Sequence, residues 1–285
     1  MKSGIYYITF TIIIGIFSLN VAVASIVTDG LVSYWTFDRG TIVSNTLKDV
    51  IGNSNGTIMG NPKIVPGYTG DALKFDGVGD FVNLTTMDDF GEKFGTSTFE
   101  AWFKTSNKDD WMILINTNGG FCPIFGIQLN GIKNWFHLEF IDGIIHTFIS
   151  LRFDDRGRCG IYGRGFNVHF NDGKWHHIAH TVHFMMNNGK VTRKIYINGV
   201  LRSTNNILFG GKSAFLTFTH PVYLGARDFH GKTEGYFEGM IDEVRFYDRP
   251  LTLKEIRQNF ESTTPYNVES IGKLSTVWGK IKTER

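Results

Sequence analysis

The sequence lacks an excess of either charge. Lys and Arg number 29 and Asp and Glu number 27, so the formal net charge is +2. Nucleic-acid binding requires a clustered positive excess, and this balance therefore argues against nucleic acid as a partner. Charged residues make up only 20% of the chain and hydrophobic residues 42%. This composition is too apolar for a disordered chain and is sufficient for a buried core.

The chain also lacks a long apolar run beyond its first 24 residues. At the amino terminus, Lys2 precedes an apolar run at 5–17, and the small residues Ala22 and Ala24 follow. A positive residue, an apolar core and a small-residue cleavage site are typical of a secretory signal peptide, which we assign to residues 1–24. An uncleaved anchor is the alternative, because apolar character extends over about 20 residues. Either way, we expect a secreted or cell-surface protein with no membrane span in the mature chain.

Catalytic fingerprints are missing as well. The sequence contains no P-loop and no dinucleotide-binding glycine pattern. It also contains no Ser, His and Asp residues in the order and flanking motifs of a catalytic triad. We therefore assign no catalytic residue.

Glycine and phenylalanine are abundant, whereas proline is scarce at 6 residues. Glycine contributes 33 of the 285 residues, about 12% against a usual ~7%, and phenylalanine contributes 25. Aromatic side chains fit the half-buried surface of a sheet, and glycine fits turns with a positive φ. The composition therefore indicates many short strands and excludes a helix bundle.

Alternation of apolar and polar residues, the period of a half-buried strand, runs through most of the chain. Turn residues such as Asn198 and Gly199 separate these segments. A dozen or more strands without crossover helices predict an all-β fold of antiparallel sheets packed face to face, a two-sheet β-sandwich. The expected strands are 31–37, 72–75, 81–84, 98–103, 111–115, 135–140, 147–153, 175–184, 193–197, 200–202, 222–225 and 236–247.

One short helix is predicted near the carboxyl terminus. Thr252 and Glu255 form a capping box, and Ile256 and Phe260 follow on one face. Periodicity fades after residue 262. We therefore divide the chain into a signal peptide at 1–24, a β-sandwich domain at 25–262 and a C-terminal extension at 263–285.

The two cysteines are expected to form a disulfide. Cys122 and Cys159 are an even count in a chain directed to an oxidising compartment. Two buried thiols are the alternative, because the spacing does not show whether the Cα atoms approach within about 7 Å.

Six sequence strings occur in a characteristic order along the chain, at 31–38, 49–56, 75–82, 175–179, 195–199 and 237–247. They resemble the laminin G-like jelly-roll domain of the concanavalin A-like lectin/glucanase superfamily, over roughly residues 28–262. The resemblance implies two curved antiparallel sheets in a jelly roll, a carbohydrate- or protein-recognition role and a bound calcium ion. The segment 121–165 does not match the family's motifs.

Members of this superfamily that hydrolyse β-glucans carry two carboxylates on one face of a strand, about 5–5.5 Å apart. Glu139 and Asp142 lie three positions apart, which puts them on opposite faces of a regular strand. Glu234, Glu238 and Asp242 share a face by parity but span a glycine-rich bend. The sequence therefore predicts that the protein is not an enzyme, and a glycoside hydrolase is the weakest of three functional hypotheses.

Exposed aromatic residues and a basic loop supply the candidate ligand-binding residues. Trp111 and Trp135 offer rings that stack on sugars, with core packing as the alternative. Arg156, Arg158 and Arg164 offer bidentate hydrogen bonds to an acidic sugar or a sulfate, with pairing to the loop's own aspartates as the alternative.

Four histidines, at 176, 177, 180 and 183, crowd one predicted strand. Alternation places His176 and His180 on one face and His177 and His183 on the other. Each pair lacks a third ligand, so we interpret these histidines as sandwich residues rather than as a metal site.

Oxygen-rich positions predict a calcium site where the first and last strands meet. Calcium binds six to eight oxygens from carboxylates, amides and carbonyls. Asp38 ends the first strand, and Asp242 lies in the final strand, which the resemblance places beside the first. Asp49 and Asn53 lie in a glycine-containing loop and complete the predicted ligand set. Hydrogen bonding of Asp38 and Asp49 to their own turns is the alternative.

The predicted function is recognition without catalysis, namely binding of a glycan or a glycoprotein, with calcium as a structural cofactor. The runner-up is a structural or adhesion module that binds protein and no sugar. Exposed aromatic residues on a concave face favour the first hypothesis, and a flat apolar patch of several hundred Å² favours the second.

Overall fold

The structure is a computed structural model. It describes residues 25–84, 96–107, 111–117, 134–141, 144–151, 170–185, 190–208, 222–229 and 231–262. The predicted signal peptide and the C-terminal extension lie outside these residues.

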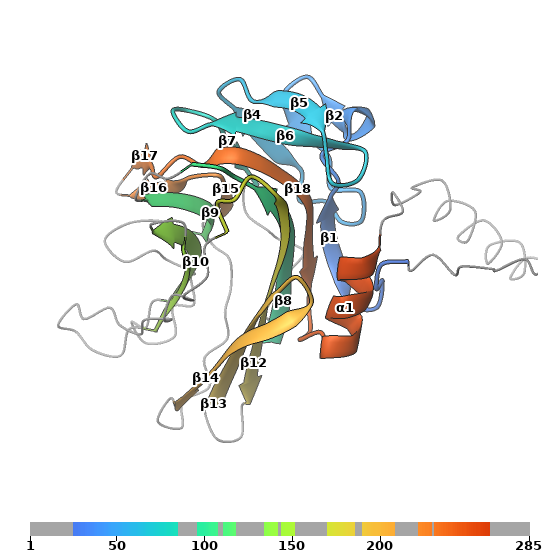
Figure 1. Ribbon diagram of the computed structural model, residues 1–285, viewed down its shortest axis with the longest axis vertical. Coiled ribbons are helices and arrows are strands. Elements are labelled where there is room, and N and C mark those ends of the chain that lie inside the picture. Colours follow the sequence, from blue (N-terminus) through green and yellow to red (C-terminus); the bar gives the residue numbers. More distant parts are fainter. Residues whose placement is uncertain are drawn as a thin grey trace, which may run out of the picture.

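Two eight-stranded sheets, sheet A and sheet B, form the body of the molecule (Figure 1). Sheet A contains, in order, β14 (Val200–Leu208), β13 (Lys190–Ile197), β12 (Trp175–Met185), β8 (Thr96–Lys104), β18 (Glu238–Tyr247), β6 (Asp71–Asp76) and β5 (Lys63–Pro66), and β1 (Leu31–Trp35) also pairs with β18. Sheet B contains, in order, β11 (Ile144–Leu151), β10 (Asn134–Ile141), β9 (Trp111–Thr117), β15 (Val222–Leu224), β7 (Phe81–Asn83), β4 (Gly56–Met59), β3 (Thr46–Leu47) and β2 (Ile42–Val43). A two-stranded ribbon of β16 (Arg227–Phe229) and β17 (Lys232–Glu234) and the 3-10 helix η1 (Arg39–Thr41) complete the strand-rich part.

The all-β sandwich predicted from alternation is confirmed. Each expected segment coincides with a strand, and the paired strands of both sheets run antiparallel. The first and last strands are neighbours, as the resemblance implied, with Trp35 of β1 opposite Val244 of β18. This pairing brings the two ends of the domain together.

The main core lies between the two sheets. Alternate residues of the strands supply its side chains, so the inner faces of the strands that reach it are mainly apolar. The Trp35 and Phe246 rings meet edge to face, with their centroids 6.0 Å apart. Ile178 of β12 and Ile197 of β13 belong to the same cluster. The face of sheet A that bears Ile178 is therefore called its inner face below.

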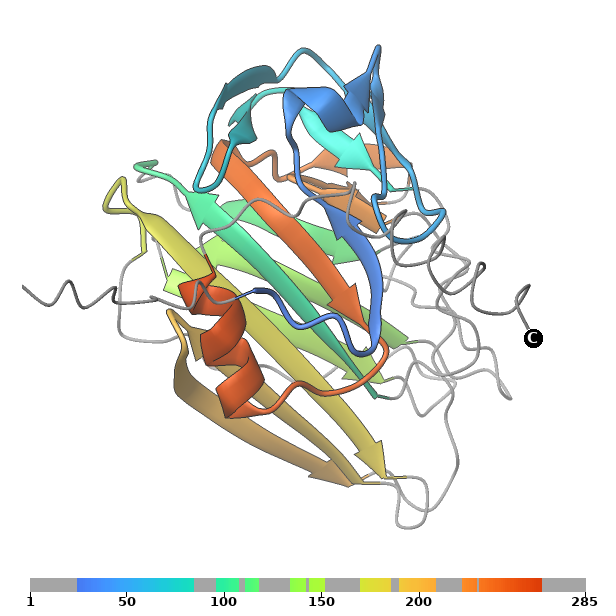
Figure 2. The same ribbon diagram turned by 90° about the vertical axis from the view of Figure 1, so that its right-hand side faces the viewer.

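The helix α1 (Leu253–Glu261) packs on the outer face of sheet A (Figure 2). Its predicted capping box is present, with Thr252 as the N-cap and Glu255 at the third helical position. Ile256 of α1 belongs to a second apolar cluster with Tyr196 and Tyr247 from the sheet. Within the described part of the chain, no helix is long and apolar enough to span a bilayer.

Candidate functional site

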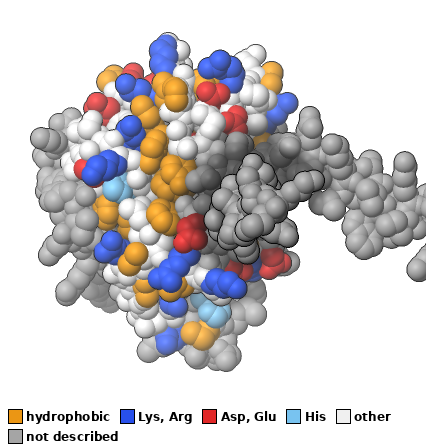
Figure 3. All heavy atoms as spheres, turned by 45° about the vertical axis from the view of Figure 1, so that its right-hand side comes forward, with side chains coloured by type: hydrophobic (Ala, Val, Ile, Leu, Met, Phe, Trp, Pro, Cys, Tyr) orange, Lys and Arg blue, Asp and Glu red, His pale blue; other side chains and the backbone are white. Residues whose placement is uncertain are grey.

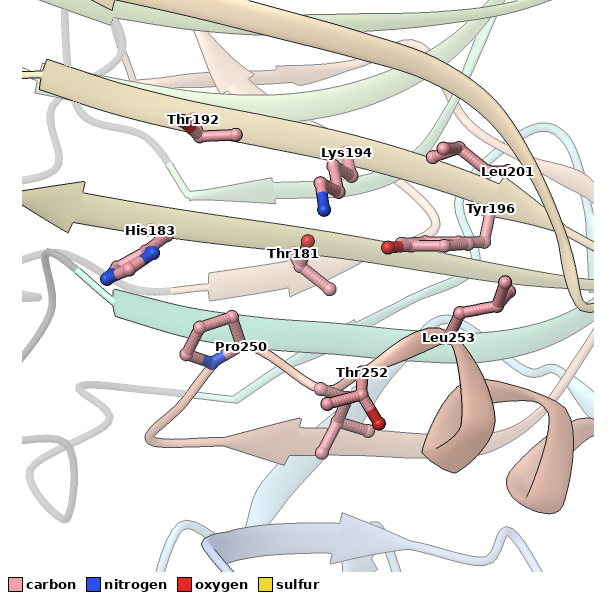
Figure 4. Close-up of a pocket in the computed structure, with 10 residues that line it drawn as sticks. Thr181, His183, Thr192, Lys194, Tyr196, Leu201, Pro250, Thr252 and Leu253 are labelled. Carbon is pink, nitrogen blue, oxygen red and sulfur yellow. The ribbon is translucent and has the colours of Figure 1, made fainter.

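A groove of about 450 Å³ lies on the outer face of sheet A, beside the amino-terminal end of α1 (Figure 4). The segment 250–253, which precedes and begins α1, forms one side of the groove. Thr98 holds this segment in place, because its Oγ1 donates to Arg249 O at 2.8 Å and accepts from Leu251 N at 2.8 Å. Strands β12, β13 and β14 supply the other side. The lining residues are Thr181, His183, Thr192, Lys194, Tyr196, Leu201, Pro250, Leu251, Thr252 and Leu253.

The strand side of the groove carries hydroxyl groups and one ammonium group. Thr181 lies opposite Lys194, and His183 lies opposite Thr192. The Tyr196 hydroxyl is hydrogen-bonded to Thr181, and burial raises the pKa of Tyr196 despite that bond, so the phenol is neutral at pH 7. The Lys194 side chain makes no ion pair or hydrogen bond with any residue that the structure describes. The groove therefore presents an unpaired cation next to hydroxyl donors and acceptors.

The opposite side of the groove is mainly apolar. It is formed by Pro250, Leu251, Thr252 and Leu253, and Leu253 is 37% exposed (Figure 4). On the strand side, Leu201 of β14 adds a further apolar side chain, which is 42% exposed. Sugar rings have apolar C–H faces and a rim of hydroxyl groups, so a site that joins aliphatic and aromatic carbon to a few polar groups matches their chemistry.

The histidines on β12 divide between the two faces as predicted. The His176 ring contacts Phe103 of the main core, with ring centroids 5.8 Å apart, whereas the His177 ring lies 5.2 Å from Trp102 beneath α1. His180 is buried and His183 is exposed. Among the described residues, no three His, Cys, Asp or Glu side chains are grouped as a metal site.

A buried ionic cluster lies between sheet A and α1. Asn259 Nδ2 donates to Glu100 Oε2 at 2.6 Å, and Arg245 Nη1 is 3.9 Å from the same oxygen. Burial raises the pKa of Glu100 to about 7, although the charge of Arg245 acts in the opposite direction. Glu243, in the left-handed conformation with φ 54°, pairs with Arg245 and accepts a hydrogen bond from the Tyr34 hydroxyl. Through Asn259, this buried cluster joins α1 to sheet A.

The predicted calcium ligands fall into two groups. Asp49 accepts hydrogen bonds from four backbone N–H groups, three of them in its own loop, so both of its oxygens are occupied. Asn53 is exposed in that loop. Asp38 and Asp242 instead hold the turn between β5 and β6: Asp38 Oδ1 accepts from Asp71 N at 2.9 Å, and Asp242 Oδ2 accepts from Tyr68 N at 2.8 Å.

Most of the predicted sugar-binding residues are not placed by the structure. Arg156, Arg158 and Arg164 lie outside the described residues, as do Cys122 and Cys159, so the disulfide stays a prediction. Trp111 and Trp135 lie in the neighbouring strands β9 and β10 of sheet B, and only their backbone is described.

Two of the carboxylates considered for hydrolysis, Glu234 and Glu238, have polar partners. Glu234 Oε1 is 2.6 Å from Arg227 Nη2, and Glu238 accepts from Asn107 Nδ2 at 2.7 Å. Asp242 is buried. Glu139 lies in β10, and Asp142 is outside the described residues.

Sequence reasoning missed the groove residues Thr181, Lys194 and Tyr196. Alternation assigns them to one face of the sheet, but it does not show that segment 250–253 folds back opposite that face. The signal that was available is the helix start at Thr252, because a helix after the last strand must pack on one of the sheet faces.

Comparison with known proteins identifies the fold. The family described as the concanavalin A-like lectin/glucanases superfamily matches residues 76–257, which lie within the predicted domain and exceed half of the chain. No curated protein matches the sequence.

Three solved structures illustrate the likeness. The binding domain of Paraclostridial Mosquitocidal Protein 1 matches with a TM-score of 0.54 and 18% identity, over 81% of this chain and 52% of that one. The binding domain of Botulinum Neurotoxin DC, in complex with SialylT, matches with a TM-score of 0.55 and 16% identity, over 84% and 53%. Domain 4 of AbnA, a GH43 extracellular arabinanase from Geobacillus stearothermophilus, in complex with arabinotriose, matches with a TM-score of 0.53 and 19% identity, over 80% and 97%. The chain thus spans about half the length of the two toxin domains.

Proposed function

Because the chain belongs to the concanavalin A-like lectin/glucanases superfamily, we propose that its domain is a non-catalytic module that recognises carbohydrate. The observation that carries this proposal is the groove beside α1. It joins an unpaired Lys194 and the hydroxyls of Thr181 and Tyr196 to aliphatic side chains on the opposite side. These are the groups that contact the hydroxyl rim and the C–H face of a sugar.

The neighbouring structures support the proposal through their ligands. One neighbour was solved with arabinotriose and another with SialylT. We propose that this domain likewise acts outside the cell, after export by the predicted signal peptide. We also propose that it is not a hydrolase, because Glu234 and Glu238 are engaged with Arg227 and Asn107 and do not form a carboxylate pair.

The proposal is tested by binding. A glycan array probed with the mature chain should identify a ligand, and calorimetry then measures its dissociation constant. Lys194→Ala removes the unpaired ammonium group and is expected to weaken binding about tenfold, the effect of losing one charge-assisted hydrogen bond. Lys63→Ala is the matched control, because Lys63 is exposed on β5 at the opposite end of sheet A.

Two results would contradict the proposal. One is an array without any bound glycan, with and without calcium. The other is an equal loss of affinity in Lys194→Ala and Lys63→Ala, which would place the binding surface away from the groove.

A protein partner is the second candidate, and the exposed leucines favour it. Leu201 and Leu253, at 42% and 37% exposure, are exposed apolar side chains that line the groove. On the visible side of the molecule, hydrophobic side chains lie next to Lys and Arg side chains (Figure 3). For a protein ligand, affinity would depend on Leu201 and Leu253 more than on Lys194, since burial of apolar surface is the dominant favourable term in most protein–protein association.

We further propose a structural calcium ion held by Asp38 and Asp242. Asp242 Oδ1 is buried and has no hydrogen-bond donor among the described residues, which leaves it available to a cation. The turn that both carboxylates hold approaches them closely: a Cβ at Gly67 would lie 2.6 Å from Asp242 Oδ2, and one at Gly70 would collide with Asp38 Oδ1. Backbone carbonyls of this turn are additional oxygen ligands of the kind that calcium takes. Asp49 and Asn53 stay outside this proposal.

A further inference from the structure

The guanidinium group of Arg193 is buried on the inner face of sheet A. Arg193 is 2% exposed, and alternation along β13 places it on the same face as Ile195, which belongs to the core between the sheets. Its partner on the neighbouring strand β12 is Val182, which is also buried. Burial lowers the pKa of Arg193 to about 10, so the group still carries its charge at pH 7.

This charge has no partner among the residues that the structure describes. Within the described part of the chain, none of Nε, Nη1 and Nη2 has a hydrogen-bond acceptor, and no carboxylate forms an ion pair with them. His180 on β12 does not supply a counter-charge, because burial and the charge of Arg193 lower its pKa and keep it neutral. A guanidinium carries five N–H donors, and leaving a buried charge without compensation is strongly destabilising. A bound anion would supply both the counter-charge and the hydrogen-bond acceptors that the Arg193 guanidinium lacks.

We propose that Arg193 anchors an anion-binding site on the inner face of sheet A, and that its ligand is an oxyanion. The planar guanidinium donates two parallel hydrogen bonds to a carboxylate, sulfate or phosphate, a geometry that an ammonium group does not provide. β13 is next to β14, the edge strand of sheet A, so the site lies near the rim of the sandwich. It is separate from the groove, because Lys194, the next residue, faces the opposite side of the sheet.

The oxyanion has two sources, the carboxylate of an acidic sugar and an inorganic ion, and thermal melting distinguishes them. The full chain is melted with glucuronate, with sulfate, with glucose and with sodium chloride at equal ionic strength. We expect glucuronate, sulfate or both to raise the melting temperature, by about 5–10 °C at a hundredfold excess over the dissociation constant. Glucose and sodium chloride are expected to leave it unchanged. A shift with glucuronate alone identifies an acidic sugar, and a shift with sulfate identifies a general oxyanion site.

Two variants assign the shift to Arg193. Arg193→Met keeps the length of the side chain, and we expect it to abolish the shift and to melt no lower than the wild type in the absence of anion, because an uncompensated charge is removed. Arg193→Lys keeps the charge but loses the planar group that donates two parallel hydrogen bonds, and it is expected to reduce the shift. Lys63→Met is the matched control and retains it in full.

Three results would overturn the proposal. The first is a wild-type protein whose melting temperature neither anion changes. The second is a shift that persists in Arg193→Met or is lost in Lys194→Ala, which would place the anion in the groove. The third is a lower melting temperature of Arg193→Met without anion, which would show that the chain itself satisfies the guanidinium.

Discussion

Glu100 and His177 show how burial at single residues couples stability to pH. Burial raises the pKa of Glu100 to about 7, and burial together with the charge of Arg245 lowers the pKa of His177 to about 3. The folded pKa of Glu100 lies above its ordinary value of 4.5, so its contribution to stability is lost as pH rises from about 4.5 through 7. His177 has the opposite sign: its folded pKa lies below 6.5, so stability is lost as pH falls below about 6.5. Between about pH 4.5 and 6.5, a rise in pH therefore lowers stability through Glu100 and raises it through His177.

Glu100→Gln separates the two effects. The variant keeps an oxygen that accepts from Asn259 but no longer titrates. We therefore expect the free energy of unfolding of the wild type, relative to the variant, to fall by about 3 kcal/mol between pH 4.5 and 7, since each unit of pKa difference corresponds to about 1.4 kcal/mol. Urea unfolding at several pH values measures this difference, and Glu238→Gln, an exposed carboxylate on β18, is the control. A difference between wild type and Glu100→Gln that does not change with pH would contradict the prediction.

At the same scale, the sequence shows which face of a strand a residue occupies but not what covers that face. Alternation correctly separated His176 and His180 from His177 and His183. It also places Glu100 and Arg245 on the outer face, yet it does not reveal that both are buried there, with Glu100 in contact with Asn259 of α1. Burial of these charges depends on tertiary packing, and so does the isolation of Arg193.

At the scale of the element, α1 is fixed by its start as well as by its apolar face. Thr252 caps the helix through the N–H of Glu255, and the Glu255 carboxylate also pairs with Arg249, with Nη2 and Oε1 2.7 Å apart. Thr252→Ala is expected to lower the free energy of unfolding by about 1 kcal/mol, whereas Thr252→Ser keeps the capping oxygen and should stay close to the wild type. Urea unfolding of the two variants tests this. Equal losses in both would show that the methyl group, and not the cap, matters.

Long elements were the easiest to predict from the sequence, although the 3-residue strands β7 and β15 were expected as well. Strands such as β8, β12 and β18 contain 9, 11 and 10 residues, enough for a clear alternation, and all three were expected. β2 and β3 contain 2 residues each, and β16 and β17 contain 3, so no period can be recognised in them. Their place in the fold follows from pairing with neighbouring strands, which is non-local information.

At the scale of the whole molecule, the two proposed binding sites lie on opposite faces of sheet A. The groove with Lys194 lies on the outer face of sheet A, and Arg193 lies on the inner face of the same strand. Successive residues of a strand point to opposite faces, so adjacent residues serve different surfaces. Binding at the groove and binding at Arg193 are therefore separable by single substitutions.

The calcium proposal belongs to this scale, because Asp38 and Asp242 join the two ends of the domain at the β5–β6 turn. Burial, with the charge of Glu243, raises the pKa of Asp242 well above its usual range, so a proton competes with calcium for this carboxylate. At pH 7.5 and a hundredfold excess over its dissociation constant, calcium is expected to stabilise the fold by about 2.7 kcal/mol, and a chelator should reverse this. Asp242→Asn keeps an oxygen that accepts from Tyr68 N but loses the charge, so its melting temperature should no longer respond to calcium. Asp76→Asn, an exposed control, should respond like the wild type. Identical melting curves with calcium and with chelator would contradict the calcium proposal.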